Sequence, residues 1–250
     1  PRLKVVGRAG IGVDNIDLAA AKSAGVTVVN SPLATTVTVA ELALGMMLAM
    51  AREIPRADAS IKGGKWLKKE FEGTELFGKT LGVIGFGRIG STMAKRAAAF
   101  DMEVRAYDLL KDANETRLNG GNPVELDELL AKADFISLHL PLTPDTKNML
   151  NAETFAKMKD GVYLVNASRG GIVDEDALLE ALNSGKVAGA ALDVFAAEPP
   201  GVSPLISHPK VVCTPHVGAQ TVEAQARAGY DIATEIVAAL KGEELRWKVA

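Results

Sequence analysis

The sequence has 250 residues, of which 48% are hydrophobic and 24% are charged, and its formal net charge is −3. This composition is typical of a globular protein that buries a sizeable core, as one large domain or two lobes. The weak negative charge gives no basic field for nucleic acid. The single cysteine, Cys213, excludes an intramolecular disulfide framework and suits a reducing compartment, so we expect the cytoplasm.

The first part of the chain predicts a short βαβ unit and then a long apolar helix. Strands are expected at 3–7 and 26–29, with a helix at 16–23 between them. The helix expected at 38–52 is apolar nearly all round, so we expect it to be buried between layers or in a subunit interface. We expect this helix to be too short and too interrupted to span a bilayer. We also expect no signal peptide, because the sequence leads straight into a strand-like run.

An irregular, polar segment at 61–78 follows, and it carries three spaced aromatic residues, Trp66, Phe71 and Phe77. Interleaved lysines and aromatics can bind nucleic acid, but glutamates neutralise this stretch. We therefore expect an arm that packs on a partner subunit, and with the apolar helix it predicts a homodimer.

From residue 80 onward, short apolar runs alternate with helical segments. Such alternation predicts a doubly wound, parallel α/β sheet of the Rossmann type. The segment 110–123 is expected to be a polar loop, and Asp174 is expected to cap the helix that follows it. Strands are predicted at 80–84, 103–107, 135–138, 162–165, 187–192 and 211–213, and helices at 91–100, 124–131, 152–158, 174–183 and 221–240.

The turn after the strand 80–84 has glycines at G-x-G-x-x-G spacing: Gly85, Gly87 and Gly90. In such a turn the first glycine allows the tight bend, the second lets the backbone approach a pyrophosphate, and the third lets the helix pack on the strand. The first helical turn presents unpaired N–H groups to the phosphates. Asp108, at the end of the next strand, is placed to accept hydrogen bonds from an adenosine ribose. The turn therefore predicts a dinucleotide site, and Asp108 favours NAD over NADP.

Several polar residues follow the carboxyl ends of predicted strands, where open α/β sheets bind ligands. Arg169 can grip a carboxylate and a keto oxygen, and His216 can deliver or take a hydroxyl proton. Glu198 can bind the other ring nitrogen and fix the tautomer. This set, beside a nicotinamide, suits hydride transfer to a 2-keto acid. His139 is expected to cap its strand and to line the cofactor cleft, and Cys213 to pack in the core.

Three segments, 166–174, 193–199 and 215–219, resemble the signature segments of the D-isomer-specific 2-hydroxyacid dehydrogenases, in the order of that family. Segments 7–15, 65–66, 71–76 and 217–225 are further similar to its D-3-phosphoglycerate dehydrogenase branch. The resemblance covers essentially the whole chain. It implies a hydride transfer between NAD and a D-2-hydroxy acid, with D-3-phosphoglycerate as the expected substrate and serine biosynthesis as the pathway. Two alternatives stay open: a glyoxylate or hydroxypyruvate reductase, and a catalytically silent NAD-binding module.

The resemblance also implies roles for particular residues. Arg169 would bind and polarise the substrate, His216 would be the acid/base, and Glu198 its partner. Arg8, Ala9 and Gly10 would meet the substrate carboxylate, and Lys68 or Lys69 could reach a substrate phosphate. No metal site is implied. The cofactor residues would be Gly85, Gly87, Arg88, Ile89, Gly90, Asp108, Leu140, Pro141, Ala167, Ser168, Asp193, Gly218 and Ala219.

The same resemblance divides the chain into two lobes. Residues 31–220 are expected to be the NAD-binding Rossmann domain. Residues 1–30 and 221–250 would be part of a flavodoxin-like substrate-binding lobe, because members of the family carry further strands and helices before the segment that matches 3–7.

Overall fold

The computed structural model describes residues 2–250. The chain forms two compact units, Pro1–Val39 with Gly218–Ala250, and Ala40–Val217. Each unit has its own parallel sheet. No helix of residues 2–250 has the length and the apolar character that crossing a membrane requires.

The larger unit is built on a seven-stranded sheet in which every pairing is parallel. The strand order is β5-β4-β3-β6-β7-β8-β9. This confirms the predicted doubly wound α/β sheet. The strands are β3 (Thr80–Ile84), β4 (Glu103–Tyr107), β5 (Asn122–Pro123), β6 (Phe135–Leu138), β7 (Val162–Asn166), β8 (Val187–Leu192) and β9 (Val211–Cys213).

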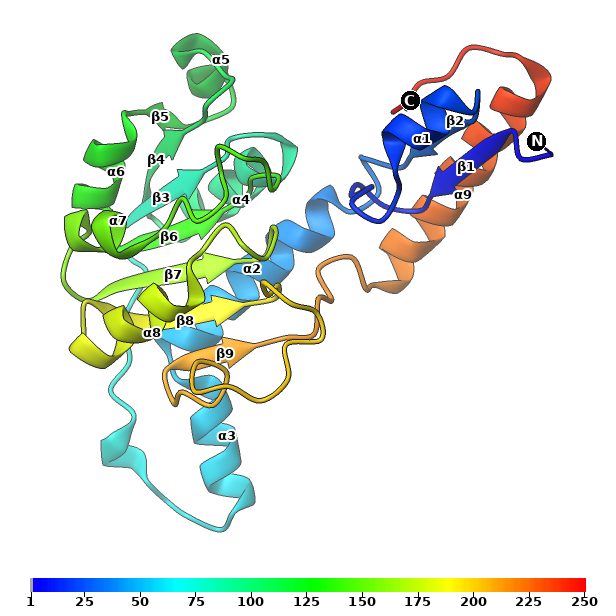
Figure 1. Ribbon diagram of the computed structural model, residues 1–250. Coiled ribbons are helices and arrows are strands. Elements are labelled where there is room, and N and C mark those ends of the chain that lie inside the picture. The colour runs from blue at the N-terminus through cyan, green and yellow to red at the C-terminus, as the bar shows by residue number, and fades with distance from the viewer. Residues whose placement is uncertain (1) are drawn as a thin grey trace. The chain divides into compact units, whose positions relative to one another are not determined.

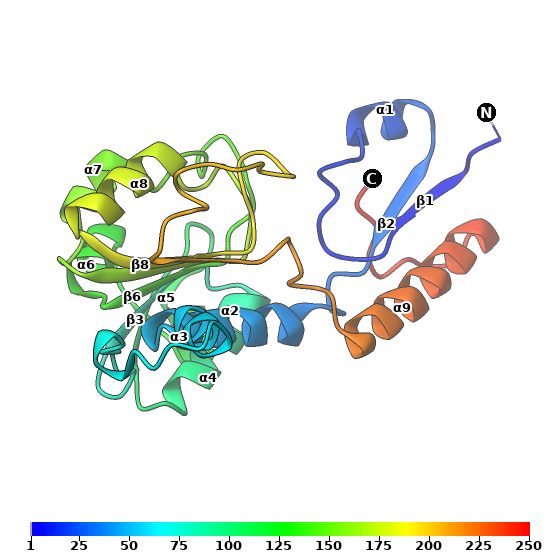
Figure 2. The same cartoon turned by 90° about the horizontal axis from the view of Figure 1, so that it is seen from below.

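Helices cover both faces of this sheet (Figures 1 and 2). One face carries α6 (Leu126–Lys132), α7 (Ala152–Lys157) and α8 (Glu175–Ser184), and the other carries α2 (Thr36–Ala51) and α4 (Arg88–Ala98). Because both faces are covered, the central strands are mainly apolar, and all four residues of β6 are buried.

The sheet has one point where the chain reverses its direction of winding. From β3 the chain moves outward through β4 to β5, and it then returns to place β6 on the other side of β3. Ligands of open α/β folds bind at the carboxyl ends of strands at such a switch point. The candidate site is therefore expected where β3 and β6 end.

The apolar helix α2 packs on the sheet of its own chain. Ala43 and Met47 are fully buried, and Met50 packs against Gly189 of β8 closely enough that a Cβ there would lie 3.0 Å from its side chain. This packing accounts for the buried side of α2, and its part in a subunit interface stays a prediction. The segment after it keeps exposed apolar side chains, with Trp66 80% and Phe77 69% exposed.

Two helices appear where the sequence analysis predicted none. The helix α3 (Ile54–Lys62) precedes and enters the segment expected to be irregular, which also holds a 3-10 turn at Lys68–Glu70. The segment 110–123, predicted to be a loop, contains α5 (Ala113–Leu118) and the short strand β5, so that prediction was wrong. The cause in α5 is local, because the Asp112 carboxylate accepts a hydrogen bond from the Glu115 N–H at 2.8 Å and caps the helix.

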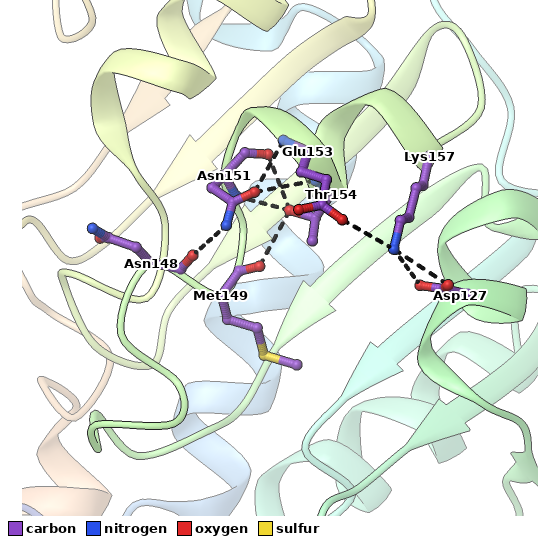
Figure 3. A network of polar contacts seen from close by, with 7 residues as sticks. All are labelled: Asp127, Asn148, Met149, Asn151, Glu153, Thr154 and Lys157. Atoms are coloured by element: carbon purple, nitrogen blue, oxygen red, sulfur yellow. Dashed lines mark hydrogen bonds and ion pairs between the residues drawn. The ribbon is translucent and has the colours of Figure 1, made fainter.

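Side chains also fix the start of α7 (Figure 3). The Asn151 side chain accepts hydrogen bonds from the Glu153 and Thr154 N–H groups, and the Thr154 hydroxyl accepts one from the Asn151 N–H at 2.8 Å. This reciprocal capping box satisfies donors that the first helical turn leaves unpaired. The expected cap of α8 is confirmed, since Asp174 accepts hydrogen bonds from two N–H groups of that helix.

The smaller unit pairs β1 (Val5–Arg8) in parallel with β2 (Thr27–Asn30). The helix α1 (Leu18–Ser23) joins them, and the long helix α9 (Val222–Lys241) packs on both. The end of the chain lies antiparallel to β2, with Lys248 opposite Val29. The buried Glu235 of α9 accepts hydrogen bonds from two N–H groups of that tail and holds it in place.

Candidate active site

The glycine turn joins β3 to α4 at the switch point. Gly85 has a φ of +90°, and a Cβ there would lie 2.5 Å from the His139 carbonyl oxygen at the end of β6. A Cβ at Gly90 would lie 2.1 Å from the Gly85 carbonyl oxygen. By contrast, a Cβ at Gly87 would meet nothing within 4 Å. Two glycines therefore permit close packing of strand, turn and helix, and the third borders open space.

This open space fits the pyrophosphate of a dinucleotide. Gly87 is the N-cap of α4 and makes no side-chain cap, so the first helical turn, with Arg88 and Ile89, faces the space with backbone amides and the positive end of the helix dipole. The residues present thus fit the predicted phosphate cradle.

Asp108 follows β4 and is tied to the same turn. One carboxylate oxygen accepts a hydrogen bond from the Phe86 N–H at 2.6 Å, and the other accepts from the Leu110 and Lys111 N–H groups at 2.9 and 3.2 Å. Each carboxylate oxygen can accept more than one hydrogen bond. The carboxylate can therefore hold the turn and still accept from a ribose hydroxyl.

The turn that carries Arg169 is fixed by a residue to which the sequence analysis gave no role. Asn166, at the end of β7, is only 2% exposed. Its side-chain oxygen accepts from the Ser168 N–H and hydroxyl at 3.1 and 2.8 Å, and its amide donates to the Arg169 carbonyl at 3.0 Å. Ala167 and Ser168 are buried beneath the turn. The Arg169 guanidinium, held at 2.7 Å from the Ser168 carbonyl, is positioned by this frame.

Glu198 and His216, which the sequence analysis paired, are in direct contact. The His216 Nδ1 lies 2.7 Å from the Glu198 Oε2, and the side chains are 49% and 38% exposed. The other Glu198 oxygen accepts a hydrogen bond from the Phe195 N–H at 3.2 Å. A carboxylate on Nδ1 favours the tautomer with the proton there and leaves Nε2 for a ligand. The pair therefore has the geometry of an oriented acid/base group.

Asp193, predicted near the nicotinamide, holds the loop of His216. It is 1% exposed, and its Oδ1 accepts from the Thr214 hydroxyl at 2.6 Å and from the Val217 N–H at 2.8 Å. Between these two residues, His216 has a φ of +53°, a left-handed conformation that costs energy for a side chain other than glycine. The buried carboxylate therefore stabilises the backbone that presents the histidine, a role that the sequence analysis did not predict.

His139 directly follows β6, its carbonyl lies next to Gly85 of the glycine turn, and its ring is buried. The Nε2 lies 2.9 Å from the Ser137 hydroxyl, whereas the buried Nδ1 has no hydrogen-bond partner. Burial lowers the pKa of His139 from 6.5 to about 4. The imidazole is therefore neutral near neutral pH. Of the next two residues, Leu140 is buried and Pro141 is exposed.

The remaining predicted residues belong to the smaller unit. Arg8 is exposed, and its guanidinium donates to the Ala9 carbonyl at 2.9 Å. Gly10 is buried, and its carbonyl accepts from the Ser31 N–H at 3.0 Å. Gly218 and Ala219 precede α9 in that unit. Their participation in one site with the residues of the larger unit stays a prediction.

Comparison with known proteins places this geometry in a family. Residues 44–218 match the model of the D-isomer specific 2-hydroxyacid dehydrogenase NAD-binding domain. The chain is 52% identical to D-3-phosphoglycerate dehydrogenase 2, chloroplastic, of Arabidopsis thaliana, over 97% of this chain and 39% of that protein. It is 51% identical to a D-3-phosphoglycerate dehydrogenase of Methanocaldococcus jannaschii, over 97% of this chain and 46% of that protein. The chain thus spans less than half the length of these two relatives.

Solved structures agree with this result. A glyoxylate reductase from Paecilomyes thermophila is 37% identical, with a TM-score of 0.92 over 98% of this chain and 75% of that one. A D-lactate dehydrogenase from Aquifex aeolicus, in complex with NAD and lactic acid, is 36% identical, with a TM-score of 0.87 over 97% of this chain and 78% of that one.

Proposed function

Because the chain belongs to the D-isomer-specific 2-hydroxyacid dehydrogenase family, we propose that it interconverts a D-2-hydroxy acid and its 2-keto acid with NAD as the cofactor. The observation that carries the proposal is the contact between Glu198 and His216 at 2.7 Å, on the strand-end edge that also holds the glycine turn. The names of the curated relatives favour D-3-phosphoglycerate and 3-phosphohydroxypyruvate as the substrate pair, and with them a place in serine biosynthesis.

The residues of the chain would divide the work as follows. Arg169 binds the substrate carboxylate and keto oxygen as a planar, charged donor. His216 gives a proton from Nε2 to the keto oxygen in reduction, and takes it back in oxidation. Glu198 keeps the ring oriented through Nδ1. NAD, when bound, supplies the hydride chemistry.

The cofactor would lie along the switch point. The amides of Arg88 and Ile89 would hold its pyrophosphate, and Asp108 its adenosine ribose. Ala167 and Ser168, which are buried just before Arg169, would border the nicotinamide. With these, the proposed cofactor residues are Gly85, Gly87, Gly90, Leu140, Pro141, Ala167, Ser168, Asp193, Gly218 and Ala219.

The test is NADH oxidation with a panel of 3-phosphohydroxypyruvate, hydroxypyruvate, glyoxylate and pyruvate, repeated with NADPH. We expect 3-phosphohydroxypyruvate and NADH to give the highest kcat/KM. A preference for glyoxylate or hydroxypyruvate would reassign the substrate. NAD binding by calorimetry without turnover of any keto acid would refute the enzyme and leave an NAD-binding module.

The His216→Ala variant tests the mechanism, with His208→Ala as a matched control that also removes an imidazole. Loss of a general acid/base is expected to lower kcat by about 10²–10⁴-fold, whereas NAD affinity stays unchanged. Undiminished turnover would remove His216 from the mechanism. Lys68→Ala should raise the KM for 3-phosphohydroxypyruvate more than the KM for glyoxylate, whereas Arg8→Ala should raise both, because both substrates carry a carboxylate.

We further propose a homodimer and a cytoplasmic location. The dimer proposal rests on the arm 61–78, whose Trp66 is 80% exposed and whose Phe71 borders an apolar pocket of about 300 Å³ with Ile61 and Leu67. Light scattering should then give twice the chain mass of 26.2 kDa, and a mass of one chain at micromolar concentration would contradict the dimer.

A further inference from the structure

The turn that carries Arg169 and the loop that carries Glu198 are packed backbone to backbone. A Cβ at Gly170 would lie 1.7 Å from the Phe195 carbonyl oxygen and 2.8 Å from the Ala196 nitrogen. Only glycine allows this approach, because real Cβ atoms do not come so close to backbone. The two loops therefore cannot move independently of each other at this point.

A second contact joins the same two segments. Glu175 is the first residue of α8, directly after the arginine turn, and its Oε1 accepts a hydrogen bond from the Ala196 N–H at 2.6 Å. Asp174 already caps the helix, with its Oδ1 at 3.1 Å from the Asp176 and Ala177 N–H groups. The Glu175 carboxylate is therefore not needed as the cap and is directed to the neighbouring loop.

The charge of Glu175 also acts on the strand that leads to the histidine. Burial, with the Glu175 carboxylate adding to it, raises the pKa of the Cys213 thiol at the end of β9. Cys213 lies three positions before His216. One carboxylate thus follows the arginine turn, binds the glutamate loop and acts electrostatically on the strand before the histidine.

We propose that Glu175 is a positioning residue for the Glu198–His216 pair, and this inference rests on the proposed function. Glu175 holds the Ala196 N–H, and Glu198 holds the N–H of the preceding residue, Phe195. The two N–H groups belong to adjacent residues. The hydrogen bond to Glu175 therefore fixes the backbone to which the Glu198 carboxylate is bound, and so fixes the position of that carboxylate. The position of that carboxylate in turn sets the contact with His216 Nδ1.

The test compares three variants of the full chain. Glu175→Ala removes the acceptor, and Glu175→Gln removes the charge but keeps an oxygen that can accept from Ala196. Asp176→Ala is the matched control, because it removes an exposed carboxylate from the same helical turn and the same favourable position near the helix dipole. Each variant is measured for kcat, KM and NAD affinity. Long-range ¹H–¹⁵N spectra of the histidine rings report which His216 nitrogen carries the proton.

We expect Glu175→Ala to lower kcat by about tenfold, the size of one lost charge-assisted hydrogen bond, with NAD affinity unchanged. The His216 spectrum should change from the Nδ1–H tautomer toward a mixture. Glu175→Gln should restore most of the activity and the tautomer, and Asp176→Ala should match the wild type in both.

Two outcomes would overturn the inference: equal kinetics for Glu175→Ala and Asp176→Ala, or an unchanged His216 tautomer in Glu175→Ala. A wild-type chain that turns over no keto acid would instead refute the proposed function. In that case the tautomer measurement still decides whether Glu175 orients the pair, so the two failures are distinguishable.

Discussion

The buried imidazole of His139 makes the stability of the larger unit depend on pH. The folded state holds this ring neutral, because burial disfavours its charged form. The unfolded chain exposes the ring to water, where its pKa is about 6.5. Between the two pKa values the unfolded chain binds a proton that the folded chain does not.

The sign and size of the effect follow from this difference. Above pH 6.5 both states are neutral, and His139 contributes no pH dependence. As the pH falls from 6.5 to about 4, the free energy of unfolding decreases, by up to about 1.4 kcal/mol per pH unit. With a pKa lowered by about 2.5, the total loss approaches roughly 3 kcal/mol, a large part of the stability of an ordinary domain.

The assay is urea unfolding of the wild type and of His139→Gln from pH 8 to pH 4. The glutamine amide can still bond the Ser137 hydroxyl but does not titrate. Every other titrating group is common to the two proteins, so the difference between their curves isolates the histidine. We expect the difference to be constant above pH 7 and to shrink or reverse toward pH 4, because only the wild type loses this contribution. Parallel curves throughout would refute the reasoning.

Three further predictions concern residues that hold the site or its supports. Gly90→Ala places a Cβ 2.1 Å from a carbonyl oxygen of the turn, so NAD affinity by calorimetry should fall by tenfold or more, since overpacking costs about 1–3 kcal/mol; unchanged affinity would show that the turn can relax. Asp193→Asn weakens both hydrogen bonds that flank the left-handed His216, so kcat should fall by about tenfold or more. A loss of NAD affinity without a change in kcat would show that Asp193 acts in cofactor binding alone. Glu235→Ala frees the tail at Trp247, and amide exchange there should accelerate by about tenfold or more, with wild-type protection as the contrary result.

The sequence was sufficient for six of the seven strands of the larger unit, because each of these follows a mainly apolar run between turns, whereas β5 (Asn122–Pro123) has no such run. Five strands begin and end where predicted: 80–84, 103–107, 135–138, 187–192 and 211–213. Burial on both faces removes any need for alternation, so the run of apolar residues itself marks the strand. The alternation with helices predicted that the strands are parallel, whereas their order became known only from the structure.

The two missed helices lack that signal. The helix α3 has no buried residue, and its Ile54 and Ile61 are more than half exposed. The helix α5 buries only Thr116 and begins at the Asp112 cap. Neither helix adds an apolar face to the core, and local contacts support them instead, such as the Asp112 cap of α5 and the ion pair between Lys62 and Asp58 of α3.

The candidate site was predictable only to the level of strand ends. Position after a strand selected Arg169, Asp193 and His216 equally, but the structure separates them by exposure. Asp193 is 1% exposed, and its Oδ1 accepts hydrogen bonds from groups of the same chain. The His216 side chain, by contrast, is 49% exposed and contacts Glu198. A buried polar group must find its partners within the protein. Polar residues at such an edge therefore fall into two groups: those that can contact a ligand and those that hold the loops in place. The geometry of the loops distinguishes the two groups, and spacing along the chain does not predict that geometry.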